Sequence, residues 1–116
     1  MKSRTHERVD TYLYSIFSFN GKFYRGNVAK LSEKDIFIRV RTDIPLDSCF
    51  ELLILEDETL LEIPVKVVWL IKGDGLYDLM CVEVLNPQKD YLEFVYSLIS
   101  ISMPIKSLNP EKKRDD

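Results

Sequence analysis

Apolar residues occupy every second position of one long segment in the middle of the chain. These positions are Leu61, Ile63, Val65, Val67, Trp69 and Ile71. Side chains of a β-strand point alternately to its two faces, so a spacing of two predicts a strand with one core-facing stripe. Pro64 lies inside this segment and cannot donate a ladder hydrogen bond, which predicts an edge or a bulge at that point.

Turn residues divide the rest of the first 85 residues into further short strands. Asn20-Gly21 is typical of a two-residue type I′ hairpin turn, because both residue types tolerate positive φ. The strands are expected at 12–19, 22–31, 36–41, 49–55, 61–71 and 76–85. Closure is the simplest way for six short antiparallel strands to avoid exposed edges. The pattern therefore favours a small six-stranded antiparallel β-barrel.

The hydrophobic period changes after residue 85. Asn86 as N-cap and Pro87 at the first helical position predict a helix over 87–103. An apolar stripe at helical spacing is formed by Tyr91, Leu92, Val95, Leu98 and Ile99. Phe94 and Ile101 lie off this stripe, so we expect a second helix face that meets a partner protein or another copy. The alternative is a helix wrapped more fully by the barrel and the tail.

The length and composition predict one domain. A chain of 116 residues with 46% hydrophobic content can bury a single core. We expect a domain over 1–103, with an arm at 1–10, the barrel at 11–85 and the helix at 87–103, followed by a polar tail at 104–116. The longest apolar run, 67–71, is too short for a membrane span, and no signal peptide is visible. We therefore expect a cytoplasmic protein without membrane insertion.

Charge is distributed unevenly along the chain. The net charge of −3 combines +5 over residues 1–41 and −8 over residues 42–116. An anionic ligand would be drawn to the first part. The aromatic residues between 12 and 24 could stack nucleic-acid bases, but an isoelectric point of about 5.2 argues against a nucleic-acid polymer as partner.

Groups that could carry catalysis are sparse. His6 is the only histidine, and the sequence contains no Gly-rich phosphate loop or metal-ligand cluster. Cys49 and Cys81 lie in separate apolar segments without C-x-x-C spacing, which predicts two buried free thiols. We expect a protein that is not an enzyme and needs no metal or cofactor.

Two arginines and a serine-bearing turn form the most informative motif. Arg4 and Arg8 stand in R-x-x-x-R spacing, and Ser32 follows within the segment Lys30-Leu31-Ser32-Glu33-Lys34-Asp35. This arrangement resembles the PilZ domain, a bacterial receptor module for cyclic di-GMP with the pattern R-x-x-x-R followed by [D/N]-x-S-x-x-G. The resemblance extends over about residues 4–100. It implies an all-β fold with a C-terminal helix, a six-stranded antiparallel PilZ-like β-barrel, and a role in bacterial signalling.

The same resemblance implies roles for individual residues. Arg4 and Arg8 would clamp the ligand, because a guanidinium fork can bind phosphate or guanine O6 and N7 in pairs. Ser32 would donate to a phosphate. Lys30 stands where the family has an acidic or amide residue, and it offers guanine no acceptor.

Asp35 stands where the family has glycine. Aspartate tolerates a left-handed conformation, so the turn can survive, but its carboxylate would repel a phosphate. We therefore expect cyclic di-GMP binding at reduced affinity. The alternative is a protein-interaction adaptor that uses the same scaffold and has lost nucleotide binding.

Overall fold

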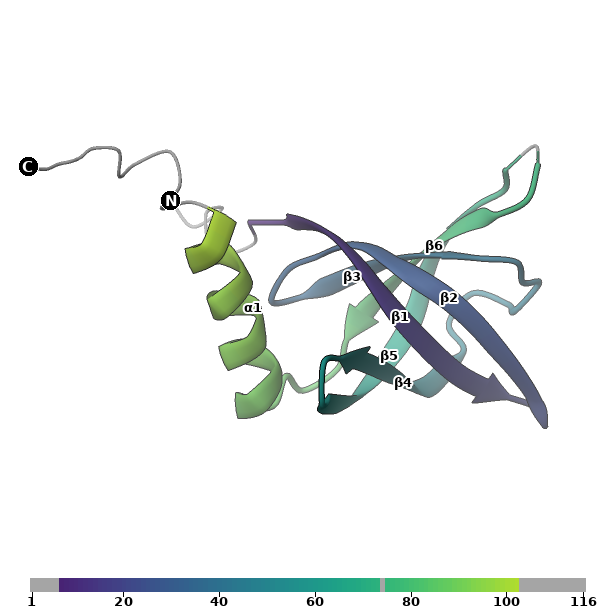
Figure 1. Ribbon diagram of the computed structural model, residues 1–116. Helices are drawn as coiled ribbons and strands as arrows, with labels where there is room; N and C mark the ends of the chain where they lie inside the picture. The colour runs from purple at the N-terminus through teal and green to yellow at the C-terminus, as the bar shows by residue number, and fades with distance from the viewer. Residues whose placement is uncertain (1–6, 74, 103–116) are drawn as a thin grey trace, which may run out of the picture.

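The computed structural model describes residues 7–73 and 75–102 of the chain. Six strands precede one helix (Figure 1). In chain order these elements are β1 (Val9–Phe19), β2 (Lys22–Leu31), β3 (Asp35–Val40), β4 (Cys49–Glu56), β5 (Thr59–Ile71), β6 (Asp78–Val84) and α1 (Lys89–Ser102). The predicted fold class is confirmed.

The strands close into an antiparallel barrel. Their order around it is β1-β2-β3-β6-β5-β4, and β4 pairs with β1 to complete the ring. The pair β1–β4 therefore lies on the opposite side of the barrel from the pair β3–β6. Helix α1 covers one end, while the β1–β2 and β5–β6 hairpins project at the other (Figure 1).

The first hairpin turns as its sequence predicts. Asn20 and Gly21 have φ values of 52° and 79°, and Phe19 pairs directly with Lys22. Positive φ at both central residues of a two-residue loop is the mark of a type I′ turn. The prediction from the Asn-Gly dipeptide is confirmed.

The apolar stripe of β5 does not face the core along its whole length. Its first four members, from Leu61 to Val67, are buried, but Trp69 and Ile71 are 55% and 46% exposed. A register shift against β6 falls between Val67 and Trp69. A β-bulge inserts one extra residue and so exchanges the two faces of the strand beyond it. The prediction was wrong for these two residues, and Leu70 packs against the core instead.

Pro64 occupies a regular position within β5. It pairs with Glu51 of β4 without a register shift, and its carbonyl accepts a hydrogen bond from the Leu85 N–H at 2.9 Å. In a strand, the N–H and the C=O of one residue point to the same neighbouring strand. The N–H that Pro64 lacks would therefore point to Leu85, just beyond the end of β6. The predicted edge or bulge is not observed at Pro64.

Helix α1 begins later than its sequence predicts. Asn86 has φ of 49°, which lies outside the extended conformation of an N-cap, and the Gln88 carbonyl accepts the first bond from Leu92 N–H at 3.0 Å. Tyr91 and Val95 are fully buried against the barrel. No helix in the described ranges is long and apolar enough to span a membrane.

Two predictions about single side chains need correction. Phe94 is half-buried and packs against the core, so it does not build a separate exposed helix face; the side chain of Ile101 lies outside the described residues. Cys49 is exposed rather than buried, because it begins β4 on the outward face, whereas Cys81 is buried.

Candidate ligand-binding site

The turn between β2 and β3 is closed by the Ser32 side chain. The buried Ser32 Oγ accepts hydrogen bonds from the backbone N–H groups of Lys34 at 3.1 Å and Asp35 at 3.2 Å. The same hydroxyl donates to Asp35 Oδ1 at 2.8 Å, and the Ser32 N–H donates to the Asp35 carbonyl at 2.8 Å. Serine in this position fixes the turn locally. Its hydroxyl proton is thus directed at Asp35.

Asp35 begins β3 and has no positive φ, unlike the described residues Asn20, Asp47, Asp57 and Asn86. The turn is therefore formed at Asp35 without the left-handed conformation that aspartate was expected to tolerate. Since the backbone is extended there, any residue can adopt it.

Arg8 and Asp35 form a two-point ion pair. Arg8 Nη2 lies 2.8 Å from Asp35 Oδ2, and Arg8 Nε lies 3.3 Å from Asp35 Oδ1. The side-chain hydrogen bond to Asp35 raises the pKa of the guanidinium, against a smaller lowering by burial. Bidentate pairing orients the planar fork as well as holding it. The carboxylate therefore occupies the same donor atoms that a phosphate or guanine would use.

Two cationic side chains lie close to the Phe37 ring. The Arg8 Cζ lies 5.1 Å from the ring centroid, and the Lys30 Nζ lies 5.8 Å from it. Lys30 and Phe37 are direct cross-strand partners. A hollow of about 520 Å³ adjoins this ring and is also lined by Arg39 and Tyr77. An aromatic ring close to two cations suits a flat, anionic ligand.

The turn is also tied to helix α1. The Tyr91 hydroxyl donates to the Ser32 carbonyl at 2.6 Å, and the Tyr96 hydroxyl donates to Glu33 Oε2 at 2.8 Å. Burial raises the pKa of the Tyr91 hydroxyl, which stays protonated and able to donate. A shift of the Ser32 carbonyl would therefore change a hydrogen bond that holds α1.

The structure brings four of the five predicted site residues together: Arg8, Lys30, Ser32 and Asp35. Arg4 lies outside the described residues. Sequence reasoning missed Phe37 as part of the site. Its position two residues after Asp35, on the outward face of the same strand, was the signal that could have found it.

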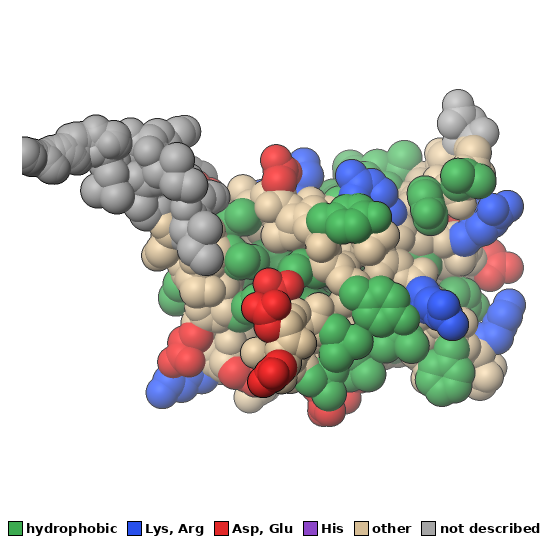
Figure 2. All heavy atoms as spheres, in the orientation of Figure 1, with side chains coloured by type: hydrophobic (Ala, Val, Ile, Leu, Met, Phe, Trp, Pro, Cys, Tyr) green, Lys and Arg blue, Asp and Glu red, His purple; other side chains and the backbone are tan. Residues whose placement is uncertain are grey.

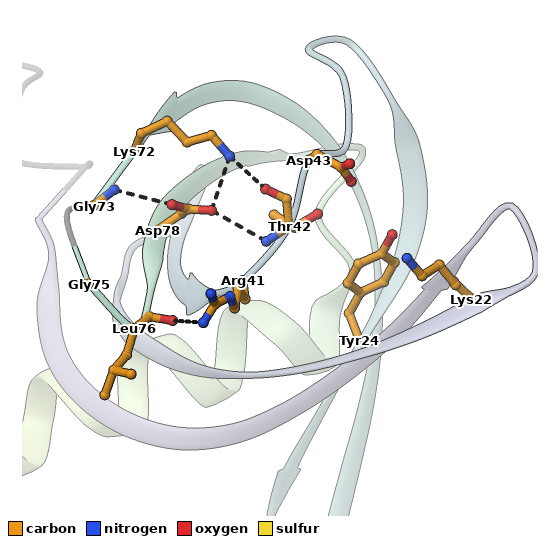
Figure 3. Close-up of a pocket in the computed structure, with 10 residues that line it drawn as sticks. All are labelled: Lys22, Tyr24, Arg41, Thr42, Asp43, Lys72, Gly73, Gly75, Leu76 and Asp78. Atoms are coloured by element: carbon orange, nitrogen blue, oxygen red, sulfur yellow. Dashed lines mark hydrogen bonds and ion pairs between the residues drawn. The ribbon is translucent and has the colours of Figure 1, made fainter.

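A second hollow, of about 550 Å³, opens at the far mouth of the barrel (Figure 3). Lys72 Nζ donates there to the Thr42 carbonyl at 3.0 Å and to Asp78 Oδ2 at 3.3 Å. The Gly73 N–H donates to Asp78 Oδ1 at 3.1 Å, and this bond is the main reason why the pKa of Asp78 is lowered. These contacts brace the loops at this mouth. None of the predicted site residues lines the hollow.

Within the described part of the chain, no group of His, Cys, Asp and Glu residues could hold a metal ion. The described site consists of arginine, lysine, an aromatic ring and a hydrogen-bonded turn.

Solved structures with a similar fold include three from two bacterial proteins. The PilZ domain of YcgR from Escherichia coli, solved with c-di-GMP, has a TM-score of 0.68 and 10% identity, covering 92% of this chain and 99% of that one. The inhibitor of motility MotI (DgrA) of Bacillus subtilis has a TM-score of 0.73 and 15% identity, covering 97% of this chain and 55% of that one. A complex of Escherichia coli YcgR with c-di-GMP has a TM-score of 0.71 and 9% identity, covering 87% and 46%.

At these identities the structural likeness establishes the fold. No curated protein matches the chain in sequence. The family model described as PilZ domain matches residues 2–97, which include the arginine arm, the whole barrel and most of α1. The chain belongs to the PilZ domain family.

Proposed function

We propose that this chain is a bacterial, cytoplasmic cyclic di-GMP receptor module without catalytic activity. The observation that carries the proposal is the Arg8 guanidinium, which lies over Phe37 beside the Ser32 turn, with Lys30 close to the same ring. Membership of the PilZ family and the c-di-GMP bound to YcgR support it. Residues 1–103 would act as one module.

The chemistry of the site fits a cyclic dinucleotide. The Arg8 fork can bind guanine O6 and N7 or a phosphate, and the Phe37 ring offers a base a surface for stacking. Lys30 can contact a phosphate as a point charge. Arg4 would supply the second half of the clamp, as the arginine motif implies. Ser32 would act mainly by holding the turn, since its hydroxyl is bonded to Asp35.

Asp35 is the feature that would reduce affinity. A ligand that takes the Arg8 fork must displace the Asp35 carboxylate, and the partly exposed ion pair resists this by about 0–1 kcal/mol. The released carboxylate then repels phosphate, and Lys30 lacks the acceptor that guanine N–H groups need. These effects together amount to a few kcal/mol, roughly a hundredfold or more in affinity.

Ligand binding would be transmitted through the turn to α1. Displacing Asp35 also frees the Ser32 hydroxyl, and the Ser32 carbonyl is held by Tyr91 of the helix. We propose that α1 passes this change to a protein partner. Tyr96, which is 49% exposed, is the large hydrophobic residue of α1 that it could offer.

A second candidate function is a protein-interaction adaptor that no longer binds nucleotide. The specific observation in its favour is the same ion pair, because Asp35 satisfies Arg8 and completes the turn without any ligand. In that case the fixed turn would serve to hold α1 for a protein partner.

Calorimetric titration with cyclic di-GMP distinguishes the two functions. For a receptor we expect saturable binding that Arg8→Ala abolishes. Arg25→Ala is the matched control, because Arg25 is an exposed arginine of β2 that lines neither of the two hollows described above. Wild-type protein that takes up no cyclic di-GMP at about millimolar ligand would overturn the receptor proposal and favour the adaptor.

A further inference from the structure

The outer face of the barrel around β1 and β4 exposes several large apolar residues. Tyr12 of β1 and Phe23 of β2 are each 77% exposed, and Tyr14 of β1, Leu55 of β4 and Leu60 of β5 are exposed as well. Figure 2 looks onto this side of the barrel, where hydrophobic side chains gather between basic groups and acidic groups. Contiguous apolar surface rimmed by charge is typical of protein–protein interfaces.

The strand register orders this face into rows. Arg25 of β2 pairs with Ile16 of β1, Ile16 pairs with Leu53 of β4, and Leu53 pairs with Glu62 of β5. Cross-strand partners share one face of the sheet, and this face is the outer one because Arg25 and Glu62 are exposed. One row across four strands thus reads cation, aliphatic, aliphatic, anion.

A parallel row lies two residues along the strands. It consists of Asn27, Tyr14, Leu55 and Leu60 in the same strand order. The two rows together give an apolar centre over β1 and β4, with one cation, Arg25, on β2 and one anion, Glu62, on β5.

This arrangement is complementary to itself. A two-fold axis in the plane of the face, running along the strands between β1 and β4, reverses each row. Arg25 then faces Glu62 of the second copy, and Tyr14 faces Leu55 of the second copy. A two-fold interface requires such a self-complementary patch.

From this register we infer that the β1–β4 face is a homodimer interface. A second copy is favoured over an unrelated protein because each chain carries both halves of the required charge pair at opposite ends of one row. Neither Arg25 nor Glu62 takes part in an ion pair within the described residues, so both charges are available to a second chain.

The interface leaves the ligand site accessible. Arg8, Lys30 and Phe37 lie over β2 and β3, whereas β1 and β4 lie opposite β6 and β3 in the barrel. The dimer would present two ligand sites on its outer sides. The inference does not depend on cyclic di-GMP binding.

Two charge reversals provide the test, read by sedimentation velocity of the full chain over a range of concentrations. Arg25→Glu places glutamates opposite each other in the dimer, and Glu62→Arg places arginines opposite each other. Each variant alone should dimerise at least about tenfold more weakly than wild type, since two like-charge contacts replace two attractive ones. An equimolar mixture of the two should form a heterodimer of near wild-type affinity, because both cross-chain pairs are then matched.

Glu83→Arg is the matched control. Glu83 is an exposed residue of β6, away from the face, and this change should leave dimerisation unaltered. Circular dichroism melts verify that all variants fold. The inference is overturned if wild type stays monomeric to about 1 mM, or if mixing the two variants fails to restore the dimer.

Discussion

The buried hydrogen bond between α1 and the β2–β3 turn predicts a measurable stability effect. We expect Tyr91→Phe to destabilise the domain, because it removes the hydroxyl that donates to the Ser32 carbonyl at 2.6 Å. Tyr91 is only 1% exposed, so water cannot easily replace this donor. The aromatic ring and its packing remain in the variant.

The size of the effect follows from the burial. Losing a neutral hydrogen bond and leaving a buried carbonyl without its donor costs about 1–2 kcal/mol. For a domain of this size, that corresponds to a fall in Tm of roughly 5–10 °C. Thermal and urea unfolding followed by circular dichroism measure both quantities.

Tyr96→Phe is the matched control for this prediction. It removes a hydroxyl at a similar distance from its acceptor, Glu33, but Tyr96 is 49% exposed. Water can solvate both groups, so the free energy of unfolding should change by less than about 0.5 kcal/mol. Equal effects of the two substitutions would refute the argument that burial gives the Tyr91 bond its importance.

Two further predictions concern the cysteines and one glycine. The exposed Cys49 should react quickly with iodoacetamide at pH 8, whereas the buried Cys81 should react slowly. Burial raises the pKa of Cys81 to about 11, which leaves roughly 0.1% thiolate at this pH. Similar labelling rates of the two cysteines, measured by mass spectrometry, would contradict this prediction. Gly26→Ala should destabilise the barrel by about 1–3 kcal/mol, since a Cβ there would lie 2.7 Å from the Arg39 carbonyl oxygen and 2.8 Å from Ile38 Cγ2. Gly75→Ala is the control, because its Cβ would meet nothing within 4 Å. Equal melting temperatures of the two variants would contradict the argument that a Cβ at residue 26 clashes with β3.

Local patterns predicted most of the barrel. The Asn20-Gly21 turn and the alternation from Leu61 to Val67 depend only on neighbouring residues, and both appear in the structure as expected. The bulge before Trp69 could not be predicted, because it is a register shift against β6. The helix start was misplaced because Asn86 adopts positive φ, another role that asparagine fills readily, instead of capping.

The ligand site was likewise predicted only in part from the sequence. The motif identified Arg8, Ser32 and Asp35, but the sequence could not show that Arg8 and Asp35 bind each other across 27 residues. Considered alone, the Asp35 carboxylate is a charge that repels phosphate. In the structure it is also the partner of the arginine that would hold the ligand, so its effect on binding is competition as well as repulsion.

The central claim is that Asp35 and Lys30 limit cyclic di-GMP binding at an otherwise retained site. Calorimetric titration of wild type, Asp35→Gly and the double variant Lys30→Asp with Asp35→Gly tests it most directly, with thermal melts to verify folding. We expect Asp35→Gly to bind about tenfold more tightly than wild type, because Arg8 is released and a repulsion is removed. The double variant should gain roughly a hundredfold, because an acceptor for guanine is also restored. Unchanged affinity in both variants, or no binding by any of the three proteins, would contradict the account.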